Sequence, residues 1–186
     1  MNADSFDVAF ICTGNRFRSP LAAALLAAET QGLPVRIESV GMLELGPMPA
    51  LPEAVSAARS FGLDLSAHTA RDLAQLDLAS FDLVLGFEQL HVRSAVGAGH
   101  AAAERTFVLP ELVVLLEALP SSPSLPEPIE RARRRIQEAD RLRAQAGSNA
   151  TVHGIADPLG RPASVQRRTA EEVQTLVSQL ARGLFT

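Results

Sequence analysis

Four short apolar runs stand along the chain, each followed by a longer segment whose apolar residues recur at helical spacing. Residues 7–11 form the first run, and a short continuous apolar run that ends at a glycine-containing turn predicts a buried strand. Similar runs predict further strands at residues 35–40, 82–87 and 106–109. Strands that are apolar along their whole length are typical of a sheet that is covered on both faces.

The segments between these runs predict helices. The first begins at Ser19 and Pro20, where serine is a favoured N-cap and proline suits the first helical position. Gly62 is expected to end the second helix, because glycine readily follows a last helical turn. The predicted helices cover residues 19–32, 52–61, a polar stretch up to about residue 97, and residues 111–119, 129–145 and 165–184.

This alternation predicts one α/β domain with three layers, in which a four-stranded parallel sheet is flanked by helices. In such sheets ligands bind at the carboxyl ends of the strands, near the point where the strand order reverses. The segment after the first strand is therefore the first place to look for chemistry.

Residues 12–19, here called the Cys12 loop, read Cys-Thr-Gly-Asn-Arg-Phe-Arg-Ser, followed by proline, between a predicted strand and a predicted helix. Gly14 and Asn15 allow a tight turn in which successive backbone N–H groups point inward and form a concave anion site. The start of the helix directs its positive dipole end at the same spot. Arg18 adds a planar fork that can bind two phosphate oxygens. The pattern predicts a phosphate-binding loop.

Cys12 lies at the start of this loop, where the field that binds phosphate also favours a thiolate. Ser19 is placed to add a hydroxyl hydrogen bond to the sulfur. The alternative is a buried core cysteine at a strand end, which is one of the commonest fates of a free cysteine. The spacing C-x5-R by itself is weak, but the full string between a strand and a helix favours a nucleophile.

The Cys12 loop with Pro20 resembles the signature C-x-G-N-x-x-R-S-P of the low-molecular-weight protein-tyrosine phosphatase family, and it matches at every specified position. Residues 62–71, 81–85 and 155–158 also resemble stretches of that family. The resemblance implies a single phosphatase domain over residues 1–186, with an insertion at about residues 119–148.

The resemblance also implies roles. Cys12 would be the nucleophile that forms a phosphocysteine intermediate, Arg18 would clamp the phosphoryl oxygens, and Asp157 would be the general acid and then the base. Asp157 by itself, in a loop with proline and glycine, would be taken for a turn residue. The substrate would be a phosphorylated protein or a small phosphomonoester, and phosphate, sulfate or vanadate would occupy the same site. The phosphate-binding residues would be Thr13, Gly14, Asn15, Arg16, Phe17 and Ser19.

Three positions depart from the family pattern. Phe17 stands where many members have a second cysteine, so no protective disulfide with Cys12 is expected. Leu159 stands where members that act on phosphotyrosine often have an aromatic residue, and Phe17 or Phe87 is expected either to supply a ring or to pack in the core. Arg16 is either a cation at the rim that favours acidic or extended phosphosubstrates, or a solvent-facing or acid-paired residue.

Other functions are compatible with parts of the pattern. An arsenate reductase that uses a low-molecular-weight thiol remains open, whereas the thioredoxin-coupled kind would need more cysteines than Cys12. A non-enzymatic module that binds a phosphorylated ligand is a second alternative. A protein-arginine phosphatase is a third, and the threonine expected in that subgroup at the position of Arg16 argues against it.

Composition excludes several other classes. The 186 residues are 47% hydrophobic with a net charge of −4, which suits one globular domain. All 17 basic residues are arginine, so a lysine-bearing nucleotide loop is excluded and no cofactor is expected. One cysteine and four scattered histidines show no metal-ligand spacing. Acidic residues interleaved with the arginines of residues 131–143 favour a solvated helix over a nucleic-acid site. The acidic start and short apolar stretches predict a cytoplasmic protein with no membrane partner.

Overall fold

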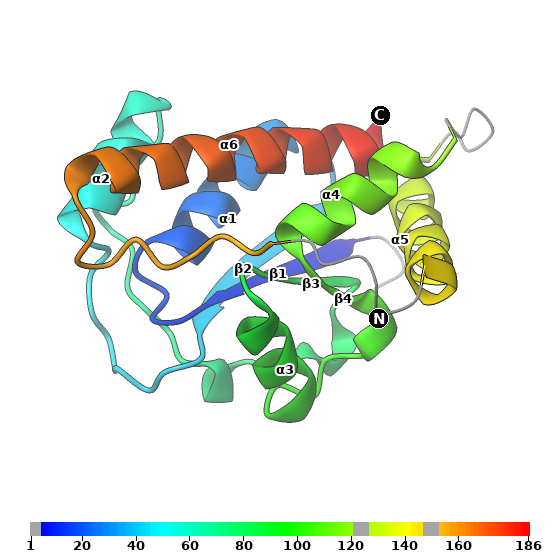
Figure 1. The fold of residues 1–186 in the computed structure, drawn as a ribbon, viewed down its shortest axis with the longest axis horizontal. Helices are drawn as coiled ribbons and strands as arrows, with labels where there is room; N and C mark the ends of the chain where they lie inside the picture. Colours follow the sequence, from blue (N-terminus) through cyan, green and yellow to red (C-terminus); the bar gives the residue numbers. More distant parts are fainter. Residues whose placement is uncertain (1–4, 121–126, 147–152) are drawn as a thin grey trace.

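The computed structural model describes residues 5–120, 127–146 and 153–186. Four parallel strands form the sheet: β1 (Phe6–Cys12), β2 (Val35–Gly41), β3 (Leu83–Gly86) and β4 (Thr106–Val108). Their spatial order is β2-β1-β3-β4, so the chain moves first to one side of β1 and then to the other (Figure 1). The predicted α/β fold with a four-stranded parallel sheet is confirmed, and the strand order reverses between β1 and β3.

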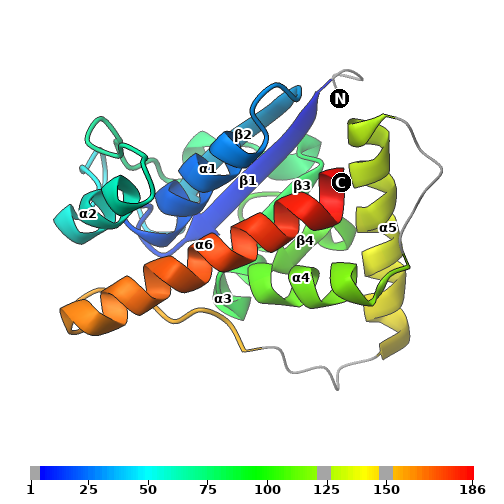
Figure 2. The ribbon, with the colours of Figure 1, turned by 90° about the horizontal axis from the view of Figure 1, so that it is seen from above.

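Helices cover both faces of the sheet. In Figure 1, α1, α4 and α6 lie on one side and α3 lies on the other, and Figure 2 shows α6 lying over the sheet in a direction similar to that of β1. Short 3-10 turns are also present: η1 (Leu73–Gln75), η2 (Leu78–Ser80) and η3 (Ala103–Arg105). The helices are α1 (Arg18–Glu29), α2 (Pro52–Ser60), α3 (Gln89–Gly97), α4 (Leu109–Ala118), α5 (Pro128–Ala146) and α6 (Ala163–Phe185).

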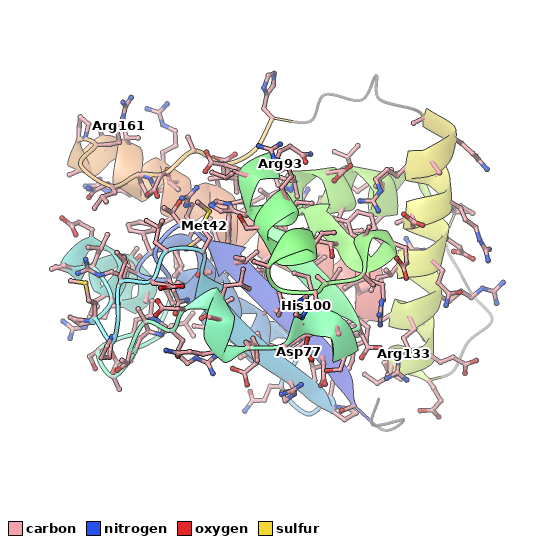
Figure 3. All side chains as sticks on the ribbon, turned by 90° about the horizontal axis from the view of Figure 1, so that it is seen from below. Met42, Asp77, Arg93, His100, Arg133 and Arg161 are labelled. Atoms are coloured by element: carbon pink, nitrogen blue, oxygen red, sulfur yellow. The ribbon has the colours of Figure 1, made fainter. Side chains whose placement is uncertain are left out.

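The core divides into two parts because alternate residues of a strand point to opposite faces. Val8 and Phe10 point into the larger cluster, which the sheet forms with α1, α4 and α6. Ala9 and Ile11 point into a smaller cluster on the face covered by α3 and the 3-10 turns, which Figure 3 shows from below. All four side chains are fully buried, which explains why β1 is apolar throughout.

The structure corrects two predicted boundaries. The first helix begins at Arg18 with Phe17 as the preceding residue, so Ser19 is not its N-cap. Pro20 is then the third helical residue, where a backbone N–H would still have no partner within the helix. The helix predicted from residue 111 begins at Leu109 and takes in Pro110 at its second position, which shortens the preceding strand.

Residues 121–126 and 147–148 of the expected insertion lie outside the described residues, and the part between them is largely α5. The solvated face predicted for this helix is one part of its surface, and another part packs against the rest of the protein. Arg135 is 8% exposed and donates to the carbonyl oxygen of Leu116 at 2.8 Å, and Arg143 donates to that of Thr106 at 2.8 Å. Arginines of α5 therefore attach the helix to the body of the protein. Within the described ranges, no helix is long and apolar enough to cross a membrane.

Candidate active site

The Cys12 loop lies at the carboxyl end of β1, where the strand order reverses. The loop that follows β2 runs beside it, since the backbone N–H of Met42 donates to the carbonyl of Cys12 at 2.9 Å. The backbone N–H of Leu51 likewise donates to the carbonyl of Arg16 at 2.8 Å. Two segments separated by a helix and a strand are thereby joined into one wall.

Asn15 fixes the shape of the Cys12 loop. Its φ of 52° places it in the left-handed region, which asparagine tolerates better than most residues. Its fully buried side chain donates to the hydroxyls of Ser19 and Ser39, both at 2.9 Å, and accepts from the backbone N–H of Arg71 at 2.9 Å. His68 Nε2 donates to the carbonyl oxygen of Asn15 at 2.7 Å. These bonds hold the sharp turn that lets the loop curl.

Gly41, at the end of β2, is needed for the loop to approach the sheet. A Cβ atom at this position would lie 2.9 Å from the carbonyl carbon of Gly14 and 3.0 Å from the backbone nitrogen of Asn15. Both neighbours are backbone atoms, which cannot swing aside as a flexible side chain would. The sequence alone does not reveal this role of Gly41, because the contact depends on Gly41 pairing with Cys12 in the sheet.

The sulfur of Cys12 and the hydroxyl of Ser19 are 3.0 Å apart. Cys12 is 3% exposed. Ser19 Oγ accepts a hydrogen from Asn15, and its own hydrogen can be donated to the sulfur at 3.0 Å or to the carbonyl oxygen of Val40 at 3.4 Å. The residue that fails as a helix cap is thus placed against the sulfur, as the sequence analysis expected.

Arg18 is 1% exposed and is held at both terminal nitrogens. Nη1 donates to the carbonyl of Ile155 at 2.7 Å and to Glu88 at 3.1 Å. Nη2 donates to Asp157 Oδ2 at 2.6 Å and to the Thr13 hydroxyl at 3.0 Å. Two carboxylates offset the cost of burying the guanidinium.

The segment that carries Asp157 joins the Cys12 loop from the far end of the chain. It is attached beyond β3, because the backbone N–H of Ile155 donates to the carbonyl of Phe87 at 2.7 Å. At Gly154 a Cβ atom would overlap that same carbonyl oxygen, so the close approach requires glycine. Asp157 Oδ1 also accepts from the backbone N–H of Leu159 at 3.1 Å, which fixes the carboxylate direction.

A pocket opens above these groups, and its outer wall is apolar. Leu43, Leu45 and Leu159 are 42%, 43% and 63% exposed and face the opening. Phe17 lines the pocket but is only 4% exposed, because most of it packs in the larger core cluster. The residues that line the pocket are Cys12, Thr13, Gly14, Arg16, Phe17, Arg18, Leu43, Leu45, Leu51, Asp157 and Leu159.

The structure shows where two residues considered for the rim of the pocket, Phe87 and Arg16, lie. Phe87 is fully buried and lines no part of the pocket; its ring centre lies 5.8 Å from the Arg18 guanidinium carbon, where it supports the arginine from behind. Arg16 lies at the pocket and its Nε donates to the carbonyl of Pro49 at 2.9 Å. Within the described ranges Arg16 forms no ion pair, so the acid-paired interpretation is not observed.

His91 and Glu88 belong to this site, although the sequence analysis assigned neither a role there. His91 Nδ1 accepts from the backbone N–H groups of Phe87 and Glu88 at 3.2 Å and 3.1 Å. Its Nε2 lies 3.2 Å from the Thr13 hydroxyl. The available signal was position: both residues follow β3, whose carboxyl end meets that of β1 at one edge of the sheet.

Acid is expected to destabilise the fold through His91. Burial, and then the charge of Arg18, lower the pKa of His91 from 6.5 to about 4, against the opposing effects of Glu88 and Asp157. The unfolded chain therefore binds this proton more readily, and the free energy of unfolding falls as pH drops from about 6.5 to about 4, by about 3 kcal/mol in total. Urea unfolding across this range measures the effect.

The matched variant for that measurement is His91→Asn, whose side-chain oxygen can still accept from the backbone while its charge does not titrate. The variant should lose less stability than the wild type on acidification. His100→Asn is the control, because His100 is an exposed histidine with a φ of 56° that asparagine tolerates. If the wild type and His91→Asn lose stability in parallel, His91 does not carry the acid sensitivity.

No group of three or more histidine, cysteine, aspartate or glutamate side chains suited to holding a metal occurs among residues 5–120, 127–146 and 153–186. His68 is half-buried, and this burial is the main cause of a lowered pKa. Its hydrogen bond to the carbonyl oxygen of Asn15 helps to hold the shape of the Cys12 loop.

Comparison with known proteins supplies independent evidence on the family of this chain. The family model for low molecular weight phosphotyrosine protein phosphatase matches residues 7–139. A protein-arginine-phosphatase of Bacillus subtilis (strain 168) is 28% identical over 181 residues, which cover 96% of this chain and 96% of that protein. The match extends over nearly the whole length of both proteins.

Two solved structures are similar over most of the chain. A low molecular weight protein tyrosine phosphatase from T. tengcongensis is 28% identical with a TM-score of 0.70, covering 95% of this chain and 98% of that one. A YwlE arginine phosphatase, solved as a cysteine-to-serine mutant with a phosphorylated active site serine, is 25% identical with a TM-score of 0.68, covering 95% and 94%. Both matches extend past residue 139, where the family model ends.

Proposed function

Because the chain belongs to the low molecular weight phosphotyrosine protein phosphatase family, we propose that it hydrolyses phosphorylated protein side chains through a phosphocysteine formed on Cys12. The family and the long matches identify a cysteine-dependent phosphatase, and they favour this function over an arsenate reductase or a binding module. We also propose the roles of the individual residues and the kind of phosphorylated side chain.

The observation that carries the proposal is the junction at Arg18. One buried guanidinium contacts the Cys12 loop through Thr13 and contacts Asp157 at 2.6 Å. It brings a nucleophile at the end of β1 together with a carboxylate near the end of the chain, on either side of one pocket. A nucleophile, a cation and a proton donor around one cavity are what transfer of a phosphoryl group to cysteine requires.

The first step transfers the phosphoryl group to sulfur. The Cys12 thiolate attacks phosphorus, an S–P bond forms, and the bond from phosphorus to the leaving oxygen breaks. Protonated Asp157 gives its hydrogen to that oxygen, so the product leaves as a neutral hydroxyl. Loop N–H groups and Arg18 stabilise the charge on the phosphoryl oxygens. A phosphoryl dianion competes with Asp157 for Nη2 of Arg18, which releases the carboxyl to act.

The second step returns the enzyme. Asp157, now a carboxylate, takes a proton from water as the water oxygen attacks phosphorus. The S–P bond breaks, inorganic phosphate is formed, and Cys12 leaves as a thiolate that Ser19 stabilises from 3.0 Å. Protonated Asp157 is restored, so one carboxyl serves both steps.

Phosphotyrosine is the proposed substrate side chain. Leucine side chains at positions 43, 45 and 159 form an apolar wall that can cover the faces of a flat ring. Phosphoarginine is a second candidate, favoured by the match to a protein-arginine-phosphatase over 96% of both proteins. Arg16, at the position where that subgroup is expected to have threonine, argues against it.

The proposal also includes the expected ligands, partners and domain extent of the chain. Phosphate, sulfate or vanadate would bind in the pocket of Cys12 and Arg18, whereas a nucleic acid or a membrane surface would not be a partner. Residues 1–186 would form one domain with residues 119–148 as an insertion. The cytoplasmic location expected from the sequence stays a prediction.

The test of this function is hydrolysis of 4-nitrophenyl phosphate and of matched phosphotyrosine and phosphoarginine peptides. We expect turnover to persist in EDTA, because the nucleophile is a thiolate and not a metal-bound water, and to be inhibited by vanadate. Faster turnover of the phosphoarginine peptide would overturn the substrate choice but not the phosphatase chemistry. Loss of activity in EDTA that returns with added metal would overturn the thiolate mechanism.

A further inference from the structure

The buried histidine below the Cys12 loop is held in one protonation state and one direction. His91 is fully buried, and its Nδ1 accepts hydrogen bonds from two backbone N–H groups at 3.1 and 3.2 Å. A ring nitrogen that accepts carries no hydrogen, so the hydrogen of the neutral ring is on Nε2. Nε2 lies 3.2 Å from the Thr13 hydroxyl and must therefore be the donor in that bond. The pKa of about 4 keeps the ring neutral near neutral pH.

The Thr13 hydroxyl thus receives two hydrogen bonds. Besides the one from His91, Arg18 Nη2 donates to it at 3.0 Å, and a guanidinium can only donate. Both acceptor positions of Thr13 Oγ1 are filled, so the hydroxyl hydrogen has to point elsewhere. Within the part of the chain that the structure describes, this hydrogen has no protein acceptor, and Thr13 lines the pocket beside Cys12 and Asp157.

We propose that the Thr13 hydroxyl is an oriented hydrogen-bond donor to the phosphoryl group in the pocket, and that His91 is the positioning residue that fixes its direction. The inference rests on the phosphatase function proposed above and adds a side-chain donor to it. Because both lone pairs of the Thr13 hydroxyl are already used, the hydroxyl can only donate a hydrogen bond. The oxygens of a phosphoryl dianion carry no hydrogen and can accept it. A donor fixed before the substrate arrives does not have to reorganise as charge develops on those oxygens.

The test is a double-mutant cycle on hydrolysis of 4-nitrophenyl phosphate. Thr13→Val removes the hydroxyl at nearly constant volume and should lower kcat/KM by about tenfold to a hundredfold, while Thr13→Ser should restore most of it. His91→Asn removes the Nε2 donor and should lower kcat/KM by about threefold to tenfold. In the Thr13→Val background His91→Asn should change little, because the hydroxyl on which it acts is gone.

Additional readouts separate positioning from a structural role. Inhibition by vanadate should weaken in step with kcat/KM in both single variants. Thr30→Val is the matched control, since Thr30 is buried and its hydroxyl donates to the carbonyl oxygen of Leu26 in α1. If His91→Asn and Thr13→Val have multiplicative effects in the double variant, His91 acts through the fold and the positioning role is overturned. If Thr13→Val turns over like the wild type, the donor role is overturned.

A negative result for Thr13 and His91 can be distinguished from failure of the proposed phosphatase function. If Cys12→Ser keeps the activity of the wild type, the thiolate mechanism is wrong and the cycle no longer concerns a phosphocysteine enzyme. If Cys12→Ser is inactive but the effects of His91→Asn and Thr13→Val on kcat/KM multiply in the double variant, only the roles proposed for Thr13 and His91 are contradicted. The combination that supports the inference is an inactive Cys12→Ser with a cycle in which the two effects are not independent.

Discussion

Replacing Cys12 by serine is expected to abolish turnover of 4-nitrophenyl phosphate, lowering kcat by about 10⁴-fold or more. A serine hydroxyl is a weak nucleophile at neutral pH, whereas a cysteine thiolate is an intrinsically strong one. Cys12 lies at the pocket opposite Ser19 and is the only cysteine of the chain, so no second thiol can replace it. Steady-state hydrolysis measures the loss.

Folding of the Cys12→Ser variant has to be shown separately. Serine is slightly smaller than cysteine and can still meet the Ser19 hydroxyl, so the loop that binds the anion should remain. Inorganic phosphate should therefore raise the unfolding temperature of the variant, as it does for any protein whose folded state alone binds the ligand. Turnover of the variant at the rate of the wild type would overturn the assignment of the nucleophile.

Replacing Asp157 by asparagine is expected to lower kcat/KM, which reports the first step, by about 10² to 10⁴-fold when the leaving group is poor, and by much less when it is good. A poor leaving group departs as a strongly basic oxygen and needs a proton, whereas 4-nitrophenolate leaves without one. Asparagine can still accept the hydrogen bond from Leu159 N–H, so the loop geometry should be kept. A series of aryl phosphates with different leaving groups measures the slope.

Asp77→Asn is the matched control for this variant. Asp77 Oδ1 accepts from the backbone N–H two residues further on, at 3.1 Å, as Asp157 Oδ1 does. Asp77 is 73% exposed and lies on the underside of the molecule, where Figure 3 labels it. The control should leave kcat unchanged for every leaving group. An equal loss of kcat/KM for good and poor leaving groups in Asp157→Asn would mean that the carboxylate acts on Arg18 and does not donate a proton in the first step.

The two carboxylates that contact Arg18 also affect how a phosphoryl group can bind to this arginine. Glu88 and Asp157 contact different nitrogens of one guanidinium, at 3.1 and 2.6 Å. Their side chains are 37% and 36% exposed while the arginine is buried, and Asp157 also lines the pocket. A dianionic phosphoryl group can displace one carboxylate more readily than two, because the second carboxylate and the Ile155 carbonyl keep the arginine in place.

Prediction from the sequence was most successful where the contacts are local. Residues 12–20 are contiguous, so their order alone places a turn, an arginine and a serine around a cysteine between a strand and a helix. Helical periodicity located α1 to α6, because burial of one face repeats at a fixed spacing, and continuous apolar runs located the four strands, because both faces of the sheet are covered. Ser19 shows the limit: a serine before a proline is a good N-cap, yet this hydroxyl bonds to a sulfur instead.

Prediction failed where contacts join distant segments. Asp157 is 139 residues from Arg18, and only a resemblance to known phosphatases suggested that the two act together. His91, Glu88 and Gly41 carried no motif, since each matters through its position at a strand end next to another strand.

The sequence by itself determined the local chemistry of this protein: a sulfur at the end of a strand, a tight anion-binding turn, and an arginine at the start of a helix. The tertiary structure alone decided which distant groups complete it. Sheet order brings the end of β3 beside the end of β1, which sets His91 against Thr13 and leaves room for the segment of Asp157. Hydrogen bonds act only over about 3 Å, so the partners of Arg18 were settled by folding and not by neighbourhood in the chain.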